Sequence, residues 1–241
     1  MLKIGHRGAK AYACENTLSS FKKALSLGVD MVEFDVRITK DEHPVIIHDG
    51  TLSRLAKKFQ RVSRLTLAEL KEIKLKNNES IPTLGEILEI LDSKVGFNIE
   101  LKVKGSARVV VQTLRDYKVD MKNVMVSSNH PSEIKKVEHL EPDIITALIF
   151  RATNAFNFWF ISDFLAILFL PITKYYICWL VKNAHADYLS INHHLLSKKK
   201  VALFKKRGIK ICAWTVNSQK KIDYLKDLGI DGIITNYPDR L

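Results

Sequence analysis

The chain has 241 residues, 46% hydrophobic and 27% charged, which is typical of a globular protein long enough for one large core. Its formal net charge of +12 favours an anionic partner: a phosphorylated substrate, an acidic membrane surface or nucleic acid. The three cysteines are an odd number, widely spaced, and form no CxxC motif, which indicates reduced thiols in a cytosolic protein.

The first elements are predicted close to the N-terminus. A short strand begins at Leu2 and ends in His6-Arg7-Gly8, which leaves no room for a signal peptide and favours a cytoplasmic location. A helix is expected to open near Asn16-Thr17, with Asn16 as its N-cap, and to end at Gly28.

The second predicted strand, residues 31–36, carries two carboxylates between apolar residues. Glu33 and Asp35 are two residues apart and therefore share one face of the strand. Adjacent buried like charges are costly unless a pKa shifts or a cation binds. The segment 45–49 follows after a short turn, so it must return antiparallel and bring His48 towards Asp35.

Helices and strands alternate along the rest of the chain. Thr66-Leu67-Ala68-Glu69 and Thr83-Leu84-Gly85-Glu86 are capping boxes that open helices, and Gly229 closes a helix over 218–228. Apart from the return strand, eight strands are counted, so the sequence predicts a single α/β domain over 1–241, a (β/α)8 TIM barrel with a β-hairpin after strand 2. The later strands are predicted at 97–103, 124–127, 144–149, 188–191, 209–216 and 232–235.

One segment, Ala155 to Val181, is more apolar than a barrel helix requires. It is an insertion between strands 5 and 6, on the side of the barrel where active sites lie. A helix that is apolar all round is either deeply buried or in contact with lipid. Asp163 and Pro171 interrupt the segment, which favours a position in the membrane interface over a span.

Polar residues gather at the predicted C-terminal strand ends, where barrel enzymes place their active sites. The carboxylates of Glu33, Asp35 and Glu100 form an oxygen-rich set that suits a divalent Mg²⁺ or Ca²⁺ ion better than zinc. His6 and His48 suit acid–base catalysis beside such a metal, because their pKa lies near neutrality.

Short motifs recur in a characteristic order and spacing over nearly the whole chain. They are His6-Arg7-Gly8, Glu15-Asn16-Thr17, Glu33-Phe34-Asp35-Val36, Thr39-Lys40-Asp41, His48-Asp49-Gly50-Thr51-Leu52, Asn98-Ile99-Glu100-Leu101-Lys102, Trp214-Thr215-Val216-Asn217 and Gly232-Ile233-Ile234-Thr235. In these motifs the chain resembles the glycerophosphodiester phosphodiesterase family.

The resemblance implies a metal-dependent barrel that hydrolyses glycerophosphodiesters to glycerol 3-phosphate and an alcohol. Glu33, Asp35 and Glu100 would bind the metal, while His6 and His48 would be the acid–base pair. The residues that would contact the phosphate or line and support the site are Arg7, Lys102, Trp214 and Glu15. The chain departs from the family pattern at Cys14, Leu55, Ser128 and Asn236, which puts substrate preference in question more than activity.

Alternatives remain open at this stage. Lys102 could pair only with Glu100, and either histidine could be the base, although His6 is favoured. The enzyme could be a lysophospholipase D acting on membrane lysophospholipids, or a catalytically silent membrane- or ligand-binding relative. The segment 155–181 could dock peripherally on the inner face of the membrane or fold back as a lid. Nucleic acid is disfavoured because neither an aromatic stacking platform nor a helix-turn-helix pattern is present.

Overall fold

The computed structural model describes residues 1–75, 78–91, 95–151 and 170–241. Within these ranges, eight parallel strands close into a barrel, because β1 pairs with both β2 and β9. This confirms the predicted TIM barrel, with strand ends shifted by one or two residues. The barrel strands are β1 (Leu2–His6), β2 (Met31–Ile38), β4 (Gly96–Leu101), β5 (Val124–Ser128), β6 (Ile145–Phe150), β7 (Tyr188–Asn192), β8 (Lys210–Trp214) and β9 (Gly232–Thr235).

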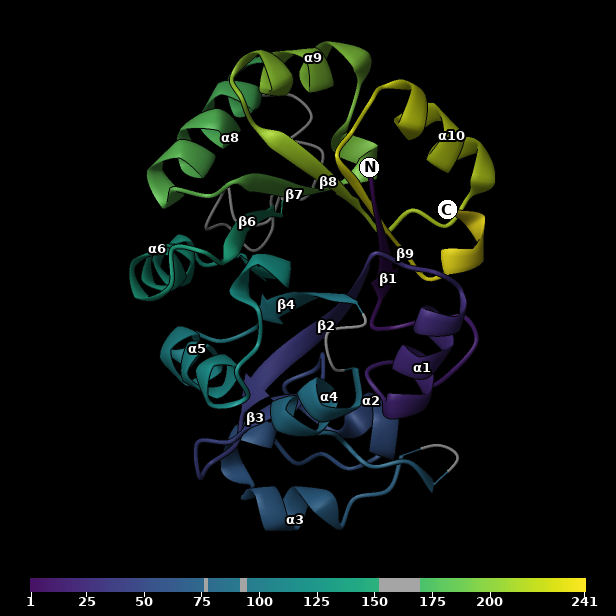
Figure 1. Ribbon diagram of the computed structural model, residues 1–241, viewed down its shortest axis with the longest axis vertical. Helices are drawn as coiled ribbons and strands as arrows, with labels where there is room; N and C mark the ends of the chain where they lie inside the picture. The colour runs from purple at the N-terminus through teal and green to yellow at the C-terminus, as the bar shows by residue number, and fades with distance from the viewer. Residues whose placement is uncertain (76–77, 92–94, 152–169) are drawn as a thin grey trace.

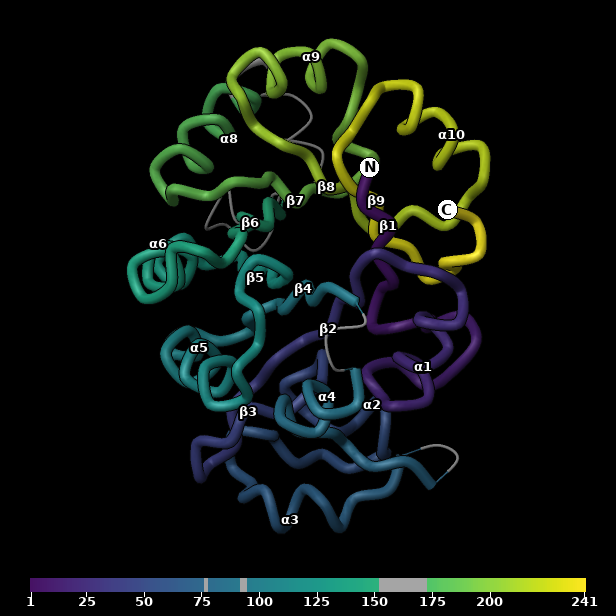
Figure 2. The backbone as a smooth tube through the Cα atoms, in the orientation of Figure 1, coloured from purple at the N-terminus to yellow at the C-terminus, as the bar shows by residue number. Residues whose placement is uncertain are grey.

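Helices surround the barrel in chain order, as Figures 1 and 2 show. The two predicted capping boxes are present, since Thr66 and Glu69, and likewise Thr83 and Glu86, exchange side-chain and backbone hydrogen bonds. The helices are α1 (Leu18–Ser26), α2 (Ser53–Ala56), α3 (Leu67–Lys71), α4 (Leu84–Leu91), α5 (Ser106–Asp116), α6 (Pro131–Leu140), α8 (Leu170–Ala184), α9 (Lys198–Lys206) and α10 (Gln219–Asp227).

The predicted hairpin after β2 is also present. Strand β3 (Pro44–Ile46) pairs antiparallel with the end of β2, where Val36 faces Ile46. The predicted strand over 45–49 is too long, because the chain leaves the sheet after the Ile47 amide bonds to the Asp35 carbonyl at 2.9 Å. His48 therefore lies in a loop at the barrel mouth and can turn towards the strand ends.

The expected N-cap of α1 was wrong by one residue. Thr17 caps the helix, and its side chain accepts a hydrogen bond from the Ser20 amide. Asn16 instead has a positive φ of 58° and donates its side-chain amide to Asp35 Oδ2 at 2.8 Å. The Asn16 side chain, which the local pattern assigned to the helix cap, thus forms a tertiary hydrogen bond with the buried Asp35 carboxylate instead.

The apolar insertion is described only in part. Residues 155–169 of the predicted segment lie outside the described residues, and Leu170 begins α8. Pro171 falls in the first turn of this helix, where a missing N–H costs little. Among the helices that the structure describes, none combines the length and apolar character needed to cross a membrane.

Candidate active site

Three carboxylates meet at the C-terminal end of the barrel. Glu33 and Asp35 point inwards from β2, and Glu100 comes from β4, where it is the register partner of Asp35. One oxygen from each side chain lies within 4.8 Å of the others, and all three residues are buried. The alternation of β2 and its pairing with β4 therefore produce the predicted convergence.

The three buried carboxylates repel one another, and burial together with this repulsion shifts pKa values in the cluster. Burial, then Asp35 and Glu100, raise the pKa of Glu33 well above its usual range. Burial and the Asp35 charge likewise raise the pKa of Glu100. Burial would raise the pKa of Asp35 too, but Lys102 and Arg7, followed by His48 and the Asn16 hydrogen bond, lower it to about 2. The cluster thus favours additional positive charge.

Two predicted phosphate-binding cations are engaged with these carboxylates. Lys102 Nζ lies 2.7 Å from Glu100 Oε1 and 3.2 Å from Asp35 Oδ1, so it does not pair with Glu100 alone. Arg7 Nε lies 3.1 Å from Asp35 Oδ2, and its Nη1 donates to Glu15 Oε1 at 2.7 Å. Both cations are therefore fixed beside the carboxylate cluster by ion pairs.

His6 lies at the end of β1, beside the carboxylates. Its Nδ1 is 2.6 Å from the Asn236 side-chain oxygen, and its Nε2 is 4.0 Å from Glu33 Oε2. An amide oxygen can only accept, so Nδ1 carries the hydrogen and a neutral ring leaves Nε2 free to accept a proton. Burial, with the Arg7 charge, lowers the pKa of His6 to about 4.

His48 has a different partner. Its Nδ1 lies 2.7 Å from the Asp49 carboxylate, and its backbone carbonyl accepts a hydrogen bond from Arg37 Nε at 2.8 Å. Burial lowers the pKa of His48, while Asp35 and the Asp49 hydrogen bond oppose that shift. A carboxylate stabilises the protonated ring, so His48 is better placed than His6 to carry a proton.

The two remaining predicted residues support the site in different ways. Glu15 is buried and pairs with Arg7, Lys10 and Arg54, and although burial opposes it, these cations hold the pKa of Glu15 below its usual range. Trp214 ends β8, and its buried Nε1 has no hydrogen-bond partner within the described part of the chain. Glu15 therefore orders the basic residues, and Trp214 keeps a donor available.

The residues at the mouth fit a divalent cation. Asp35 Oδ1 is buried without a hydrogen-bond partner among the described residues, although Lys102 is close by. Three carboxylate oxygens with no thiolate among them form a donor set typical of Mg²⁺ or Ca²⁺. A divalent charge would also relieve the repulsion that raises the pKa values of Glu33 and Glu100.

Comparison with known proteins agrees with this geometry. The model of the glycerophosphoryl diester phosphodiesterase family matches residues 6–240. This chain belongs to that family. A glycerophosphodiester phosphodiesterase of Caldanaerobacter subterraneus is 30% identical over 253 residues, covering 100% of this chain and 96% of the relative. YhdW of Bacillus subtilis is 34% identical over 250 residues, covering 99% of this chain and 96% of that protein.

A solved structure extends the likeness to three dimensions. An Oleispira antarctica phosphodiesterase in complex with the product sn-glycerol-3-phosphate superimposes with a TM-score of 0.82 and 27% sequence identity, covering 98% of this chain and 93% of that one. The barrel and the family are therefore established for this chain.

Sequence reasoning missed several residues of this family member's site. Asn16 binds Asp35, Asn236 binds His6, and Arg151 Nη2 lies 3.2 Å from Glu100 Oε1. Arg151 follows β6 directly, so its place at a strand end was a usable signal. Asn236 follows β9 in the same way, but only the closed barrel brings β9 beside β1.

Proposed function

We propose that the protein hydrolyses glycerophosphodiesters to glycerol 3-phosphate and an alcohol, with a divalent metal held by Glu33, Asp35 and Glu100. The observation that carries the proposal is the convergence of these carboxylates with two histidines at the mouth of a family barrel. When bound, the metal neutralises charge on the phosphoryl oxygens and orients the substrate.

The two histidines divide the proton transfers. His6 is the base, because its ring is held neutral with Nε2 free to take a proton from water or from the neighbouring glycerol hydroxyl. His48 is the acid that protonates the leaving alcohol, because the Asp49 carboxylate stabilises its charged ring. The amide partner of one histidine and the carboxylate partner of the other support this assignment.

The basic residues bind and orient the phosphate. Arg7 and Lys102 are fixed beside Asp35 by ion pairs, so their charges are in place before substrate arrives. Trp214 offers its unpaired Nε1–H to a substrate oxygen, and Glu15 keeps Arg7 in position.

The direct test is turnover of glycerophosphocholine beside lysophosphatidylcholine, each with and without Mg²⁺ or Ca²⁺. Metal-dependent release of glycerol 3-phosphate from glycerophosphocholine is expected. Absence of turnover with every metal would contradict the proposal and favour a silent relative. Preference for lysophosphatidylcholine would identify a lysophospholipase D, the second candidate, which the apolar segment 155–181 favours.

The described part of that segment also supports peripheral contact with the cytoplasmic membrane face. Helix α8 exposes Tyr175, Tyr176 and Trp179, with 52%, 38% and 58% of their surfaces accessible. Rings of this kind favour the headgroup level of a bilayer. Neither α8 nor α9 contains an acidic residue, whereas both carry lysines, so this face suits anionic lipid.

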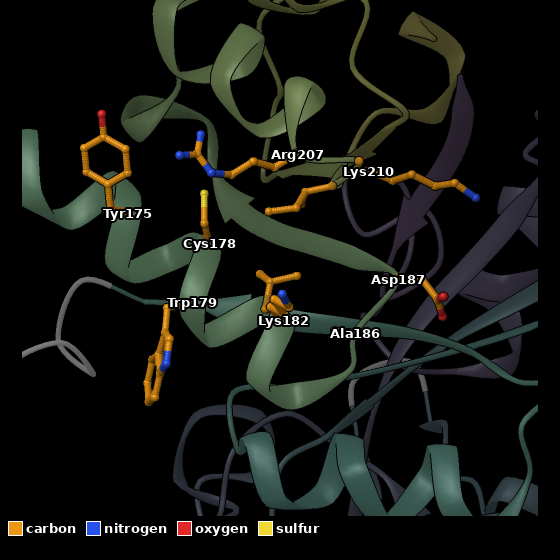
Figure 3. A pocket seen from close by; sticks show the side chains of 11 residues that line it. Tyr175, Cys178, Trp179, Lys182, Ala186, Asp187, Arg207 and Lys210 are labelled. Carbon is orange, nitrogen blue, oxygen red and sulfur yellow. The ribbon is translucent and has the colours of Figure 1, made fainter.

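A cavity of ≈ 740 Å³ opens on the same face, between α8 and the turn that leads into β8. In Figure 3 the Arg207 side chain extends over Cys178 towards Tyr175, and its guanidinium carbon lies 5.2 Å from that ring. Trp179 and Lys182 line the other part of the cavity. Lys182, Arg207 and Lys210 outnumber the single carboxylate of the lining, Asp187, so the cavity suits an anionic headgroup better than a cationic one.

Replacing Tyr176 and Trp179 with serine tests this contact. Co-sedimentation with vesicles of phosphatidylglycerol and phosphatidylcholine should fall, while turnover of glycerophosphocholine should remain. Replacing the exposed Tyr224 of α10 by serine is the matched control. Unchanged co-sedimentation would contradict docking through α8, and loss of turnover with binding intact would favour a lid.

A further inference from the structure

Arg37 is an unassigned cation on the strand that supplies two of the three carboxylates. Glu33, Asp35 and Arg37 alternate along one face of β2, so Arg37 lies about 6–7 Å beyond Asp35 along the strand. The parallel register with β4 ends at Val36, and Arg37 pairs with Val45 of the hairpin. Arg37 therefore lies at the outer rim of the mouth, one level above the carboxylates.

The Arg37 side chain is held in place from two sides. Its Nε donates to the His48 carbonyl at 2.8 Å. Its guanidinium lies over Gly50, where an added methyl group would be 3.4 Å from Nη1. Because the Nε–H is bonded to the His48 carbonyl and the Nη groups lie against Gly50, the guanidinium is already ordered, and less side-chain entropy is lost when it binds a ligand group.

Arg37 also lacks the carboxylate partner that its neighbours have. Within the described ranges, no carboxylate oxygen lies within 4.0 Å of its guanidinium, whereas the other mouth cations are all paired. These paired cations are Arg7, Lys10, Arg54, Lys102 and Arg151. The Nη donors of Arg37 are thus available to a substrate.

The charge balance of the mouth decides what those donors would bind. The five paired cations and Arg37 face the carboxylates of Glu15, Glu33, Asp35, Asp49 and Glu100. Basic groups therefore outnumber acidic ones before a divalent cation is added. A phosphodiester supplies a single negative charge, and Arg7 and Lys102 flank its place beside Asp35. The outer level remains electropositive and would repel a cationic alcohol.

We propose that Arg37 binds an anionic group on the alcohol portion of the substrate, so that the enzyme prefers glycerophosphodiesters with a negatively charged alcohol. This inference rests on the proposed function, whose reaction it narrows to a substrate class. Arg37 is a specificity residue, and it also positions the His48 backbone.

The test compares three soluble substrates with one wild-type enzyme. Glycerophosphocholine has a cationic alcohol, glycerophosphoglycerol an uncharged one, and glycerophosphoinositol 4-phosphate an anionic one. Wild-type kcat/KM should be highest for the anionic substrate and lowest for the choline substrate. Arg37→Gln should reduce the ratio of the anionic to the choline value by about 10- to 100-fold, because a charged hydrogen bond is lost.

Two variants control for other effects of the substitution. Arg37→Lys keeps the charge and should retain much of the ratio, whereas Arg108→Gln removes an exposed charge on α5 and should leave the ratio unchanged. Loss of the His48 contact lowers kcat on all three substrates and leaves the ratio intact, so the ratio isolates the specificity role. The melting temperature confirms that each variant is folded.

Two results would overturn the inference. If Arg37→Gln lowers kcat/KM equally for all three substrates, Arg37 acts only on the phosphodiester group or on the His48 backbone, and not on the alcohol. A wild-type enzyme that turns over all three substrates equally would remove the charge preference. If wild-type enzyme turns over none of them with any metal, the proposed function itself fails, which is a distinguishable outcome.

Discussion

The barrel mouth and the outer face of α8 both collect charge, but they do so in different environments. At the mouth, Asp35 is fully buried and is matched by Lys102 and Arg7 within 3.2 Å. On α8 and α9 the lysines stand on helices without a single carboxylate, beside exposed rings such as Trp179.

The difference in burial gives the two regions different expected roles. Burial itself is the largest cause of the pKa shifts of His6 and Glu33, and neighbouring charges, Arg7 for His6 and Asp35 for Glu33, act in the same direction. Exposed charges on α8 are screened by water and salt and act on a partner surface over a Debye length of about 8 Å. Changes at the mouth should therefore alter catalysis, and changes on α8 should alter only attachment.

The largest effect should come from removing the metal. Chelation with EDTA should reduce turnover to background, and Mg²⁺ or Ca²⁺ should restore it, because the buried carboxylates repel one another and the phosphate without a cation. Glu33→Gln should prevent the restoration, whereas the exposed Glu72→Gln should not. Full activity in excess EDTA would contradict a metal role for the cluster.

The histidines should have the next largest effect. His6→Ala and His48→Ala should each lower kcat by about 10²- to 10⁴-fold, the usual contribution of a general acid or base. The double variant should be little worse than either single one, because the two residues act as a unit. Near wild-type turnover in a folded single variant would remove that histidine from the mechanism.

The buried state of His6 should also be visible in stability. The pKa of His6 is about 4 in the folded protein and 6.5 in the unfolded chain. Between these two pH values the His6 ring is therefore protonated in the unfolded chain but neutral in the folded protein. Stability is therefore lost as the pH falls from about 6.5 towards 4. In metal-free protein, wild type should lose about 2 kcal/mol more than His6→Asn between pH 7 and pH 5. Urea unfolding measures this difference, and parallel profiles would contradict it.

The smallest effect should come from the exposed rings of α8. The free energy of unfolding in the Tyr176→Ser, Trp179→Ser double variant should change by only about 0.5 kcal/mol per site, the range for exposed positions. Turnover of a soluble diester should stay near wild type. A large loss of either quantity would show that α8 supports the mouth and that the two regions are not independent.

Much of the fold and of the site could be predicted from local pattern. Alternation in β2 placed Glu33 and Asp35 on one face, and the short turn after it fixed an antiparallel return that delivers His48. The capping boxes at Thr66 and Thr83 located two helix starts. These features depend on neighbours a few residues apart, so the sequence contains the physics that determines them.

The partners of the proposed catalytic groups depended on contacts across the barrel. Asn236 meets His6 only because β9 closes against β1, and the two residues are 230 positions apart in the chain. Asn16 leaves the helix cap because Asp35 requires a buried donor. Whether Arg37 has a carboxylate partner is likewise decided by three-dimensional packing. The sequence by itself determined which strands carry the charged residues. The tertiary structure decided which partner each charge has, because the energy of an ion pair or hydrogen bond depends on burial and on the distance between residues that are far apart in the chain.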